Sequence, residues 1–278
     1  MTDFETLQVE HGEAITWIVL DRPDKANALS QELLDELGVA LAELVDEGAP
    51  VIGIRGAGRG FSAGYDLGAL GKKAELDPIA DRARLQGYVD RYLQIWDHPK
   101  PVIAAIHGFC MAGATQLCTF TDITVVADDA RIGEPKLPIG GGFVAPLWAP
   151  LVGPKRAKEL AFVVGNSIDG PTAVEWGWAN HSVPADDLLP AVEGLARRIA
   201  LTPPDVLRVK KLSINRAMEA MGIRHATTSA AEMDTLLHLA PEVRELRKWV
   251  GEVGLGEAIK RYKVPPSNPL RPLPADGD

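Results

Sequence analysis

The sequence predicts an α/β domain followed by a helical C-terminal segment. Two observations carry this prediction. Short apolar runs rich in β-branched residues alternate with segments of helical periodicity up to about Pro154, and helical patterns dominate beyond it. Strands that alternate with helices and then give way to helices alone are typical of an α/β domain with a helical end. No break in composition marks a long linker between the two parts.

The first elements are predicted from their residue composition and from the residues that begin and end them. The run AITWIVLD after Gly12 is rich in β-branched and aromatic residues and predicts a strand. Ser30 can cap a helix over 31–48, in which leucines recur at helical spacing and which Gly48 can end. The stretch PVIGIRG then predicts a buried strand that runs into the glycine-rich turn GAGRGFSAGYDL.

The middle of the chain repeats this order. A helix over 79–96 is expected to end before His98, because a residue that precedes proline disfavours helix. The stretch PVIAAIHG predicts the next strand, GATQLCTF a short buried helix, and DITVVAD and ARIGEP two further short strands. The helices expected in the remainder cover 154–164, 171–177, 186–201, 203–220 and 225–262.

Composition and charge exclude several classes of function. The formal net charge is −9, so no overall positive field attracts nucleic acid or acidic membranes. Only Cys110 and Cys118 are present, both in one apolar segment, so we expect no disulfide framework and a cytoplasmic location. We expect no signal peptide, because acidic residues precede the first apolar run. No uncharged apolar stretch reaches the roughly 18 residues of a membrane helix.

Two turns between a strand and a helix share one property. FSAGYDL follows the strand over 51–55, and HGFCMAGATQ follows the strand over 102–106. Each places small residues where the backbone turns sharply and where a ligand can approach main-chain N–H groups. One N–H from each turn could polarise a single carbonyl oxygen, which would form an oxyanion hole without side chains. A purely structural role for these glycines remains the alternative.

Five segments, taken in order, resemble the crotonase superfamily, also called the enoyl-CoA hydratase/isomerase family. They are DRPDKANALS, GAGRGFSAGYDL, PVIAAIHGFCMAGATQLCTFTDI, ARIGEPKLPIGGG and the region from GPKRAKEL to AVEWGWANHSV. The resemblance covers residues 5–263 and implies an α/β fold of the crotonase type, a spiral of repeated ββα units. It implies a spiral core over 1–200 and a helical trimerisation region over 201–263. The tail over 264–278 is Pro-rich, and this composition predicts a flexible segment. The expected assembly is a homotrimer or homohexamer.

The resemblance also implies how an acyl-CoA substrate would bind. The thioester carbonyl would lie between the backbone N–H groups of Tyr65 and Gly113, which would stabilise an enolate. Coenzyme A would enter as part of the substrate, with no tightly bound cofactor and no metal. The residues expected near coenzyme A are Lys25, Ala26, Ala28, Ala63, Asp66 and Leu67. The residues expected along the acyl group are Phe109, Met111, Pro135 and Gly141.

The chain departs from the family pattern where protons are handled. Hydratases of the family use two glutamates, and the matching positions here hold Gln116 and Lys136. A carboxamide has no useful basicity. Because a positioned acid or base contributes about 10²–10⁴-fold, ordinary hydration is not expected. Glu134 would lie on the same side of an extended segment as Lys136, and the two could form a catalytic couple or only an ion pair. The phenol of Tyr65 could reach the acyl group or only cover it.

Two classes of function are left open. The first is an acyl-CoA enzyme of the enoyl-CoA hydratase/isomerase family that forms an enolate. It could act as a decarboxylase, C–C hydrolase or thioesterase on an acyl-CoA that bears a carboxylate, which a charged Lys136 could hold. The second is a non-catalytic acyl-CoA binding protein that keeps the fold. A nucleotide enzyme is not expected, because the glycines of GAGRGFSAG lack the required spacing and context.

Overall fold

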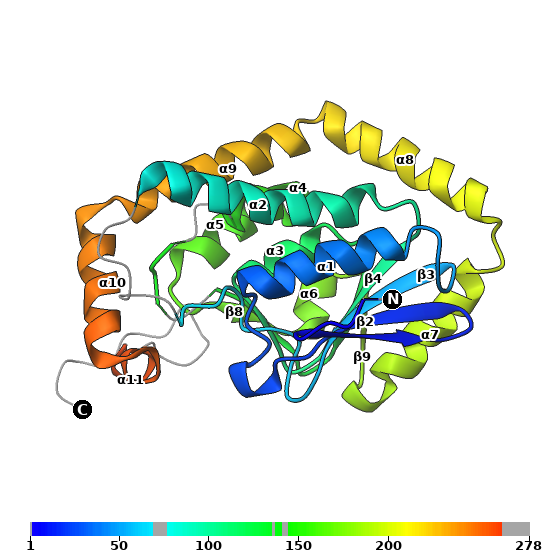
Figure 1. The fold of residues 1–278 in the computed structure, drawn as a ribbon, viewed down its shortest axis with the longest axis horizontal. Helices are drawn as coiled ribbons and strands as arrows, with labels where there is room; N and C mark the ends of the chain where they lie inside the picture. Colours follow the sequence, from blue (N-terminus) through cyan, green and yellow to red (C-terminus); the bar gives the residue numbers. More distant parts are fainter. Residues whose placement is uncertain (1, 69–76, 135–136, 141–143, 263–278) are drawn as a thin grey trace.

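A computed structural model describes residues 2–68, 77–134, 137–140 and 144–262. Two sheets form its centre, and helices surround them (Figure 1). The six-stranded sheet has the order β1-β2-β3-β4-β6-β9, and only the β1–β2 pair is antiparallel. Its strands are β1 (Leu7–His11), β2 (Ile15–Leu20), β3 (Val51–Gly56), β4 (Val102–Ile106), β6 (Ile123–Ala127) and β9 (His181–Val183).

The smaller sheet has three short strands in the order β5-β7-β8. They are β5 (Phe109–Met111), β7 (Arg131–Gly133) and β8 (Ser167–Ile168). The pair β5–β7 is parallel, and β7–β8 is antiparallel. Strand β5 follows β4 after only two residues, so the chain passes directly from the large sheet to the small one.

Helices follow most of the strands and then continue alone. The first seven are α1 (Gln31–Glu43), α2 (Pro78–Asp97), α3 (Gly113–Thr119), α4 (Val144–Val152), α5 (Pro154–Phe162), α6 (Gly170–Trp176) and α7 (Leu188–Ile199). The last four are α8 (Pro204–Ala220), α9 (Ile223–His238), α10 (Pro241–Val253) and α11 (Leu255–Arg261). Helices α8 and α9 run along the upper edge in Figure 1, with α2 beside α9.

The core lies between the large sheet and the helices on it. Every residue of β2 and β4 is buried, as expected for parallel strands that are covered on both faces. Helix α1 packs against β1 and β2, and α7 packs against β2, β4 and β6. The strand predictions for these segments are therefore confirmed, and their continuous apolar runs reflect burial on both sides.

Helix α8 touches the rest of the chain through few buried groups. Among its residues only Asn215 is fully buried, and its Nδ2 donates to the carbonyl of Trp96 at 2.8 Å. The Nζ of Lys211 lies 2.7 Å from a carboxylate oxygen of Asp122. Burial raises the pKa of Asp122 and lowers that of Lys211. This shielded ion pair ties α8 to the start of β6.

Several sequence expectations differ from the structure. The single helix predicted over 225–262 is wrong, because α9, α10 and α11 replace it. Pro241 begins α10, and Gly254, at φ +84°, separates α10 from α11. Strands β8 and β9 lie in a region where the sequence predicts only helices. Neither β1, β5 nor α4 is predicted from the sequence. None of the described helices is both long enough and apolar enough to cross a membrane.

Candidate active site

The two glycine turns lie directly against each other. The backbones of Ser62 and Cys110 are bridged, and the Met111 N–H donates to the Ser62 carbonyl at 3.0 Å. Gly64, at φ +91°, is so close to the second turn that a Cβ there would lie 2.7 Å from the Met111 oxygen and 3.1 Å from the Gly113 nitrogen. Only glycine fits this close approach, so the predicted proximity of the turns is confirmed.

The second turn holds a strained residue. Ala112 has φ +49° and ψ −122°, a conformation that glycine adopts easily and alanine does not. Its N–H donates to the Gly133 carbonyl at 2.8 Å, which fixes the turn to the end of β7. Such outliers persist only where the surroundings impose them, and they gather at functional sites.

The N–H groups of Tyr65 and Gly113, one on each turn, have no acceptor among the described residues. The N–H groups on both sides of Tyr65 are hydrogen-bonded. The Gly64 N–H donates to the Ser62 Oγ at 3.1 Å, and the Asp66 N–H donates to the Leu29 carbonyl at 3.0 Å. Gly113 begins α3, where the first N–H groups of a helix lack an intrahelical acceptor.

The side chain of Tyr65 covers the second turn. A Cβ on Gly113 would lie 2.7 Å from the Tyr65 ring. The Tyr65 hydroxyl donates to the Gln116 Oε1 at 2.6 Å and accepts from the Tyr92 hydroxyl at 3.0 Å. Its ring stacks on that of Tyr88 at a centroid distance of 4.8 Å. Burial, with Tyr92 beside it, raises the pKa of Tyr65, which keeps the phenol neutral.

Gln116 is 1% exposed, and Tyr65 fixes its amide. Because the carbonyl oxygen accepts from the phenol, the NH₂ group of the amide points away from Tyr65. The side chain of Gln116 therefore presents a hydrogen-bond donor on the side opposite to Tyr65.

Glu134 is a buried carboxyl group that directly follows β7. It follows Gly133, the residue that accepts from Ala112, and its own N–H donates to the Asn166 carbonyl at 2.9 Å. The residue is 8% exposed, and burial raises the pKa of its carboxyl to about 7. Lys136, Pro135 and Gly141 were predicted site residues that lie outside the described residues.

The loop expected to hold coenzyme A is joined to the first turn. The Ala63 N–H donates to the Ala26 carbonyl at 2.9 Å, and the Leu29 N–H donates to the Gly64 carbonyl at 2.8 Å. Lys25 ends a short 3₁₀ turn, and Ala26, at φ +52°, leaves it. The structure thus brings Lys25, Ala26 and Ala28 beside Ala63.

Asp66 and Leu67 follow the first turn, and their side chains contact a charged residue and an apolar cluster respectively. Asp66 pairs with Arg22 at 2.9 Å. Burial raises the pKa of Asp66, but hydrogen bonds from the Gly68 N–H and Arg22 outweigh it and hold the pKa low. Leu67 packs against an apolar cluster that includes Leu137 and the C-terminal helices α10 and α11.

Phe109 and Met111, expected along the acyl group, are half-buried on β5. The ring of Phe109 leaves no room for a side chain at Gly60, since a Cβ there would lie 2.6 Å from it. Strand β5 joins the Ser62 turn on one side and β7 on the other. Both residues are therefore close to the turns in the small sheet.

A charged cluster of buried and half-buried residues, which sequence reasoning missed, lies next to Tyr88. We define it by five residues from α2, α9 and α10: Asp81, Arg84, Asp234, His238 and Arg247. Arg84 donates to the Tyr88 hydroxyl at 3.1 Å and pairs with Asp81. Asp81 also lies 2.7 Å from the Nδ1 of His238, although 157 residues separate them. The sequence pattern of α2 or of α9 alone does not predict the contact between Asp81 and His238.

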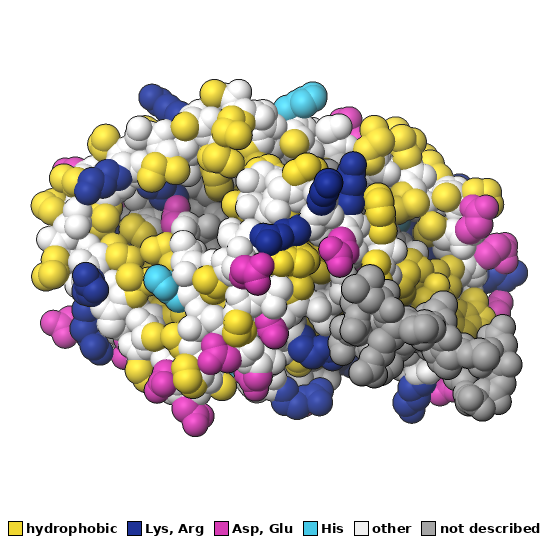
Figure 2. Space-filling model, turned by 180° about the vertical axis from the view of Figure 1, so that it is seen from behind, with side chains coloured by type: hydrophobic (Ala, Val, Ile, Leu, Met, Phe, Trp, Pro, Cys, Tyr) yellow, Lys and Arg dark blue, Asp and Glu magenta, His cyan; other side chains and the backbone are white. Residues whose placement is uncertain are grey.

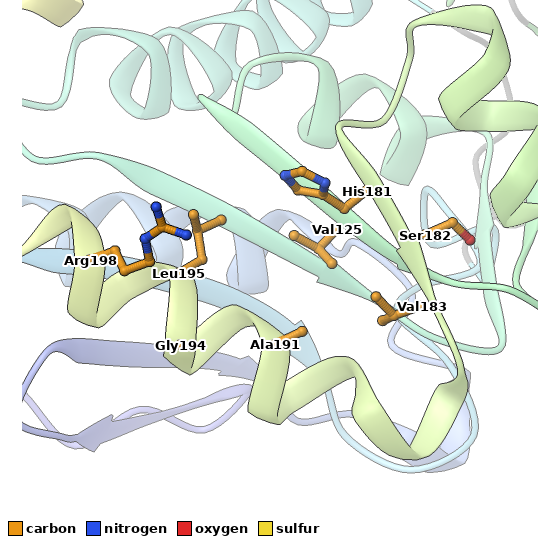
Figure 3. A pocket seen from close by; sticks show the side chains of 8 residues that line it. All are labelled: Val125, His181, Ser182, Val183, Ala191, Gly194, Leu195 and Arg198. Carbon is orange, nitrogen blue, oxygen red and sulfur yellow. The ribbon is translucent and has the colours of Figure 1, made fainter.

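A separate hollow of about 440 Å³ lies between α7 and the β6–β9 edge of the large sheet (Figure 3). Val125, His181 and Val183 line it from the strands, and Leu195 and Arg198 line it from α7. None of the predicted site residues is part of this lining. Nor do the described residues contain a group of three or more side chains that could hold a metal ion.

Comparisons with known proteins identify the family of this chain. The sequence model of the enoyl-CoA hydratase/isomerase family matches residues 10–245. The chain is 30% identical to the hydroxycinnamoyl-CoA hydratase-lyase of Pseudomonas fluorescens, over 94% of this chain and 97% of that protein.

Solved structures show the same similarity. A crystal structure assigned to this family from Novosphingobium aromaticivorans is 50% identical, with a TM-score of 0.89 over 94% of this chain and 96% of that one. Another, from Xanthobacter autotrophicus, is 33% identical, with a TM-score of 0.88 over 94% and 98%. The chain therefore has the crotonase fold and belongs to the enoyl-CoA hydratase/isomerase family of enzymes.

Proposed function

We propose that this chain is an acyl-CoA enzyme that polarises the thioester carbonyl with the N–H groups of Tyr65 and Gly113 and so stabilises an enolate. The observation that carries the proposal is the pair of unengaged N–H groups on two turns in contact. One such donor is typically worth about 2.7–4 kcal/mol in the transition state. Coenzyme A would lie along the loop of Lys25, Ala26 and Ala28, which is joined to the first turn.

Glu134 is our candidate for the general acid or base that transfers a proton to or from the substrate. A general acid or base works best when its pKa is near the operating pH, and burial brings this carboxyl to about 7. Gln116 would donate a hydrogen bond to a substrate oxygen, since Tyr65 occupies its carbonyl. Lys136 would hold a substrate carboxylate or pair with Glu134.

These residues favour a reaction other than ordinary hydration by two glutamates. Lyase or isomerase chemistry through the enolate is our first choice, and one relative is named a hydratase-lyase. Decarboxylation, C–C hydrolysis and thioester hydrolysis of an acyl-CoA that bears a carboxylate are the alternatives. A non-catalytic acyl-CoA binding protein is the second candidate, favoured by Gln116 in place of a carboxylate.

A panel of thioesters separates these functions. Purified protein is incubated with crotonyl-CoA, a malonyl-type thioester and longer acyl-CoAs, and consumption is followed by liquid chromatography. We expect one class to be turned over, with Glu134→Gln slowing it about 10²–10⁴-fold. Glu13→Gln, at an exposed residue, is the control and should keep the rate. If thioesters raise the melting temperature but none is consumed, the binding protein is supported instead.

We also propose that the chain forms a homotrimer or homohexamer through its helical end. Figure 2 shows hydrophobic side chains along the upper edge, where α8 and α9 run. Val209 and Ile214 on α8 are 64% and 65% exposed, and Leu236 on α9 is 60% exposed. Light scattering at micromolar concentration should give three or six times the chain mass, and a monomer would contradict the proposal. We further propose a cytoplasmic location, which fits a chain whose two cysteines, Cys110 and Cys118, form no disulfide.

A further inference from the structure

The N–H groups of Tyr65 and Gly113 belong to peptide groups whose carbonyls are hydrogen-bonded on the opposite side. The peptide bonds of the two turns are trans. Because a trans peptide group is planar, its C=O and N–H bonds point in nearly opposite directions. The Gly64 carbonyl, in the peptide group that carries the Tyr65 N–H, accepts from the Leu29 N–H at 2.8 Å. A donor on the carbonyl therefore fixes the direction of the N–H across from it.

The carbonyl of Ala112, in the peptide group that carries the Gly113 N–H, has two donors from Thr115. The Thr115 Oγ1 donates to it at 2.7 Å, and the Thr115 N–H donates to it at 2.9 Å. Any residue except proline supplies such an N–H, whereas only threonine or serine supplies a hydroxyl on the Cβ. Thr115 is fully buried, so bulk water does not replace its hydroxyl.

Trp148 sets the orientation of this hydroxyl. Its indole Nε1 donates to the Thr115 Oγ1 at 3.4 Å. An indole nitrogen can only donate, so the Thr115 oxygen accepts there and directs its single hydrogen to the Ala112 carbonyl. Trp148 is itself fully buried, and its ring stacks on that of Trp178 at a centroid distance of 4.8 Å. The packed core thus holds the hydroxyl in place.

These contacts form a chain of hydrogen bonds that ends at the proposed thioester site. It runs from the Trp148 indole to the Thr115 hydroxyl and from there to the Ala112 carbonyl. The Gly113 N–H lies at the other end of the same peptide group. In such a chain each bond polarises the next, which strengthens it by about 10–30%. Ala112, at φ +49°, also needs fixed partners to keep its strained conformation.

We propose that Thr115 is a positioning residue for the thioester carbonyl: its hydroxyl directs and strengthens the Gly113 N–H through the peptide group between Ala112 and Gly113. This inference rests on the proposed function and adds a residue that does not touch the substrate. The structural alternative is that the hydroxyl only completes the first turn of α3, since threonines in helices often bond a carbonyl three or four residues earlier. That alternative predicts an effect on stability alone.

The test measures the polarisation of a bound carbonyl. Octanoyl-CoA with an isotope label at the thioester carbonyl carbon is bound to the full chain, and the carbonyl stretch is recorded by isotope-edited infrared spectroscopy. In the wild type, the N–H groups of Tyr65 and Gly113 should lower the stretching frequency relative to the free thioester. Thr115→Val keeps the shape of the side chain and Thr115→Ala shortens it, and both remove the hydroxyl. Each should reduce the shift by at least about 10%.

Two further variants separate positioning from stability. Thr115→Ser keeps a hydroxyl and should give a carbonyl shift close to that of the wild type. Thr119→Val is the matched control, because it removes a hydroxyl of the same helix that donates to the Thr115 carbonyl at 2.8 Å. Any change in its melting temperature should come without a change in the carbonyl shift. For the thioester that the wild type consumes fastest, Thr115→Val should lower kcat about two- to sevenfold, which corresponds to about 10–30% of one oxyanion donor, with little change in KM.

Equal carbonyl shifts in the wild type, Thr115→Val and Thr115→Ala would overturn the inference and leave the proposed function intact, because the hydroxyl would then only stabilise α3. A Thr115→Ser shift as small as that of Thr115→Val would also overturn it. A wild type that binds octanoyl-CoA without lowering its carbonyl stretch would overturn the proposed function and this inference together. A wild type that binds neither octanoyl-CoA nor crotonyl-CoA would do the same.

Discussion

Replacing Glu134 by glutamine should change how stability depends on pH. Burial raises the pKa of this carboxyl from 4.5 to about 7, so the folded chain holds its proton where the unfolded chain has released it. In that interval the folded state binds more protons, and the free energy of unfolding falls as pH rises from about 4.5 through 7. A carboxamide of the same shape does not ionise, so Glu134→Gln lacks this loss.

The pKa difference gives the size of the effect. The pKa difference lowers the free energy of unfolding of the wild type by about 2–3 kcal/mol between pH 5 and pH 8. The side chain is nearly fully buried, so solvent screens little of it. The gain in stability of Glu134→Gln over the wild type should therefore be larger at pH 8 than at pH 5 by about that amount.

Urea denaturation at both pH values, at one fixed protein concentration, measures this difference. Glu13→Gln removes one exposed carboxylate and shows what the change in net charge does by itself. A Glu134→Gln difference that is the same at pH 5 and pH 8 would refute the reasoning, because Glu134 would then titrate alike in the folded and unfolded chains.

Three further substitutions test other parts of the structure. Gly113→Ala places a methyl group 2.7 Å from the ring of Tyr65, so kcat/KM for the best thioester should fall at least about 10²-fold in steady-state assays; an unchanged value would contradict the oxyanion geometry. Ala112→Gly relieves φ +49° and should raise the free energy of unfolding by about 1 kcal/mol in urea titrations, and a loss would show that the turn is not strained. Lys211→Met leaves the Asp122 carboxylate without its cation, with only the Val102 N–H still donating to it, and should cost about 3 kcal/mol by the same method. The control is Lys210→Met at the exposed neighbour of Lys211, which should lower the free energy of unfolding by about 0.5 kcal/mol or less. Equal losses for Lys211→Met and Lys210→Met would argue against a shielded ion pair.

Local patterns were sufficient for the central strands and for most helices. The apolar runs of β2, β3 and β4 and the leucine spacing of α1 predict those elements directly. Strand β1 was missed because it lies at the sheet edge, where only Leu7 is fully buried and the apolar signal is weak. Pro241 marks the start of α10 in the sequence itself, because proline is favoured at the first position of a helix.

The candidate site shows where sequence reasoning stops. The glycine turns at Gly64 and Gly113 were identified from small residues after strands, and the structure brings them into contact. The pairing of Asp81 with His238 was not found, because it depends on how α2 and α9 pack, which no local pattern specifies. The hydrogen bond between Tyr65 and Gln116 joins residues 51 apart and depends on tertiary packing in the same way.

A crystal structure of the protein with a bound acyl-CoA thioester tests the central claim most directly. The claim is that the main-chain N–H groups of Tyr65 and Gly113 hold one carbonyl oxygen. We predict that the thioester oxygen lies within about 2.7–3.1 Å of both nitrogens. An oxygen held by only one of them, or by neither, would contradict the account.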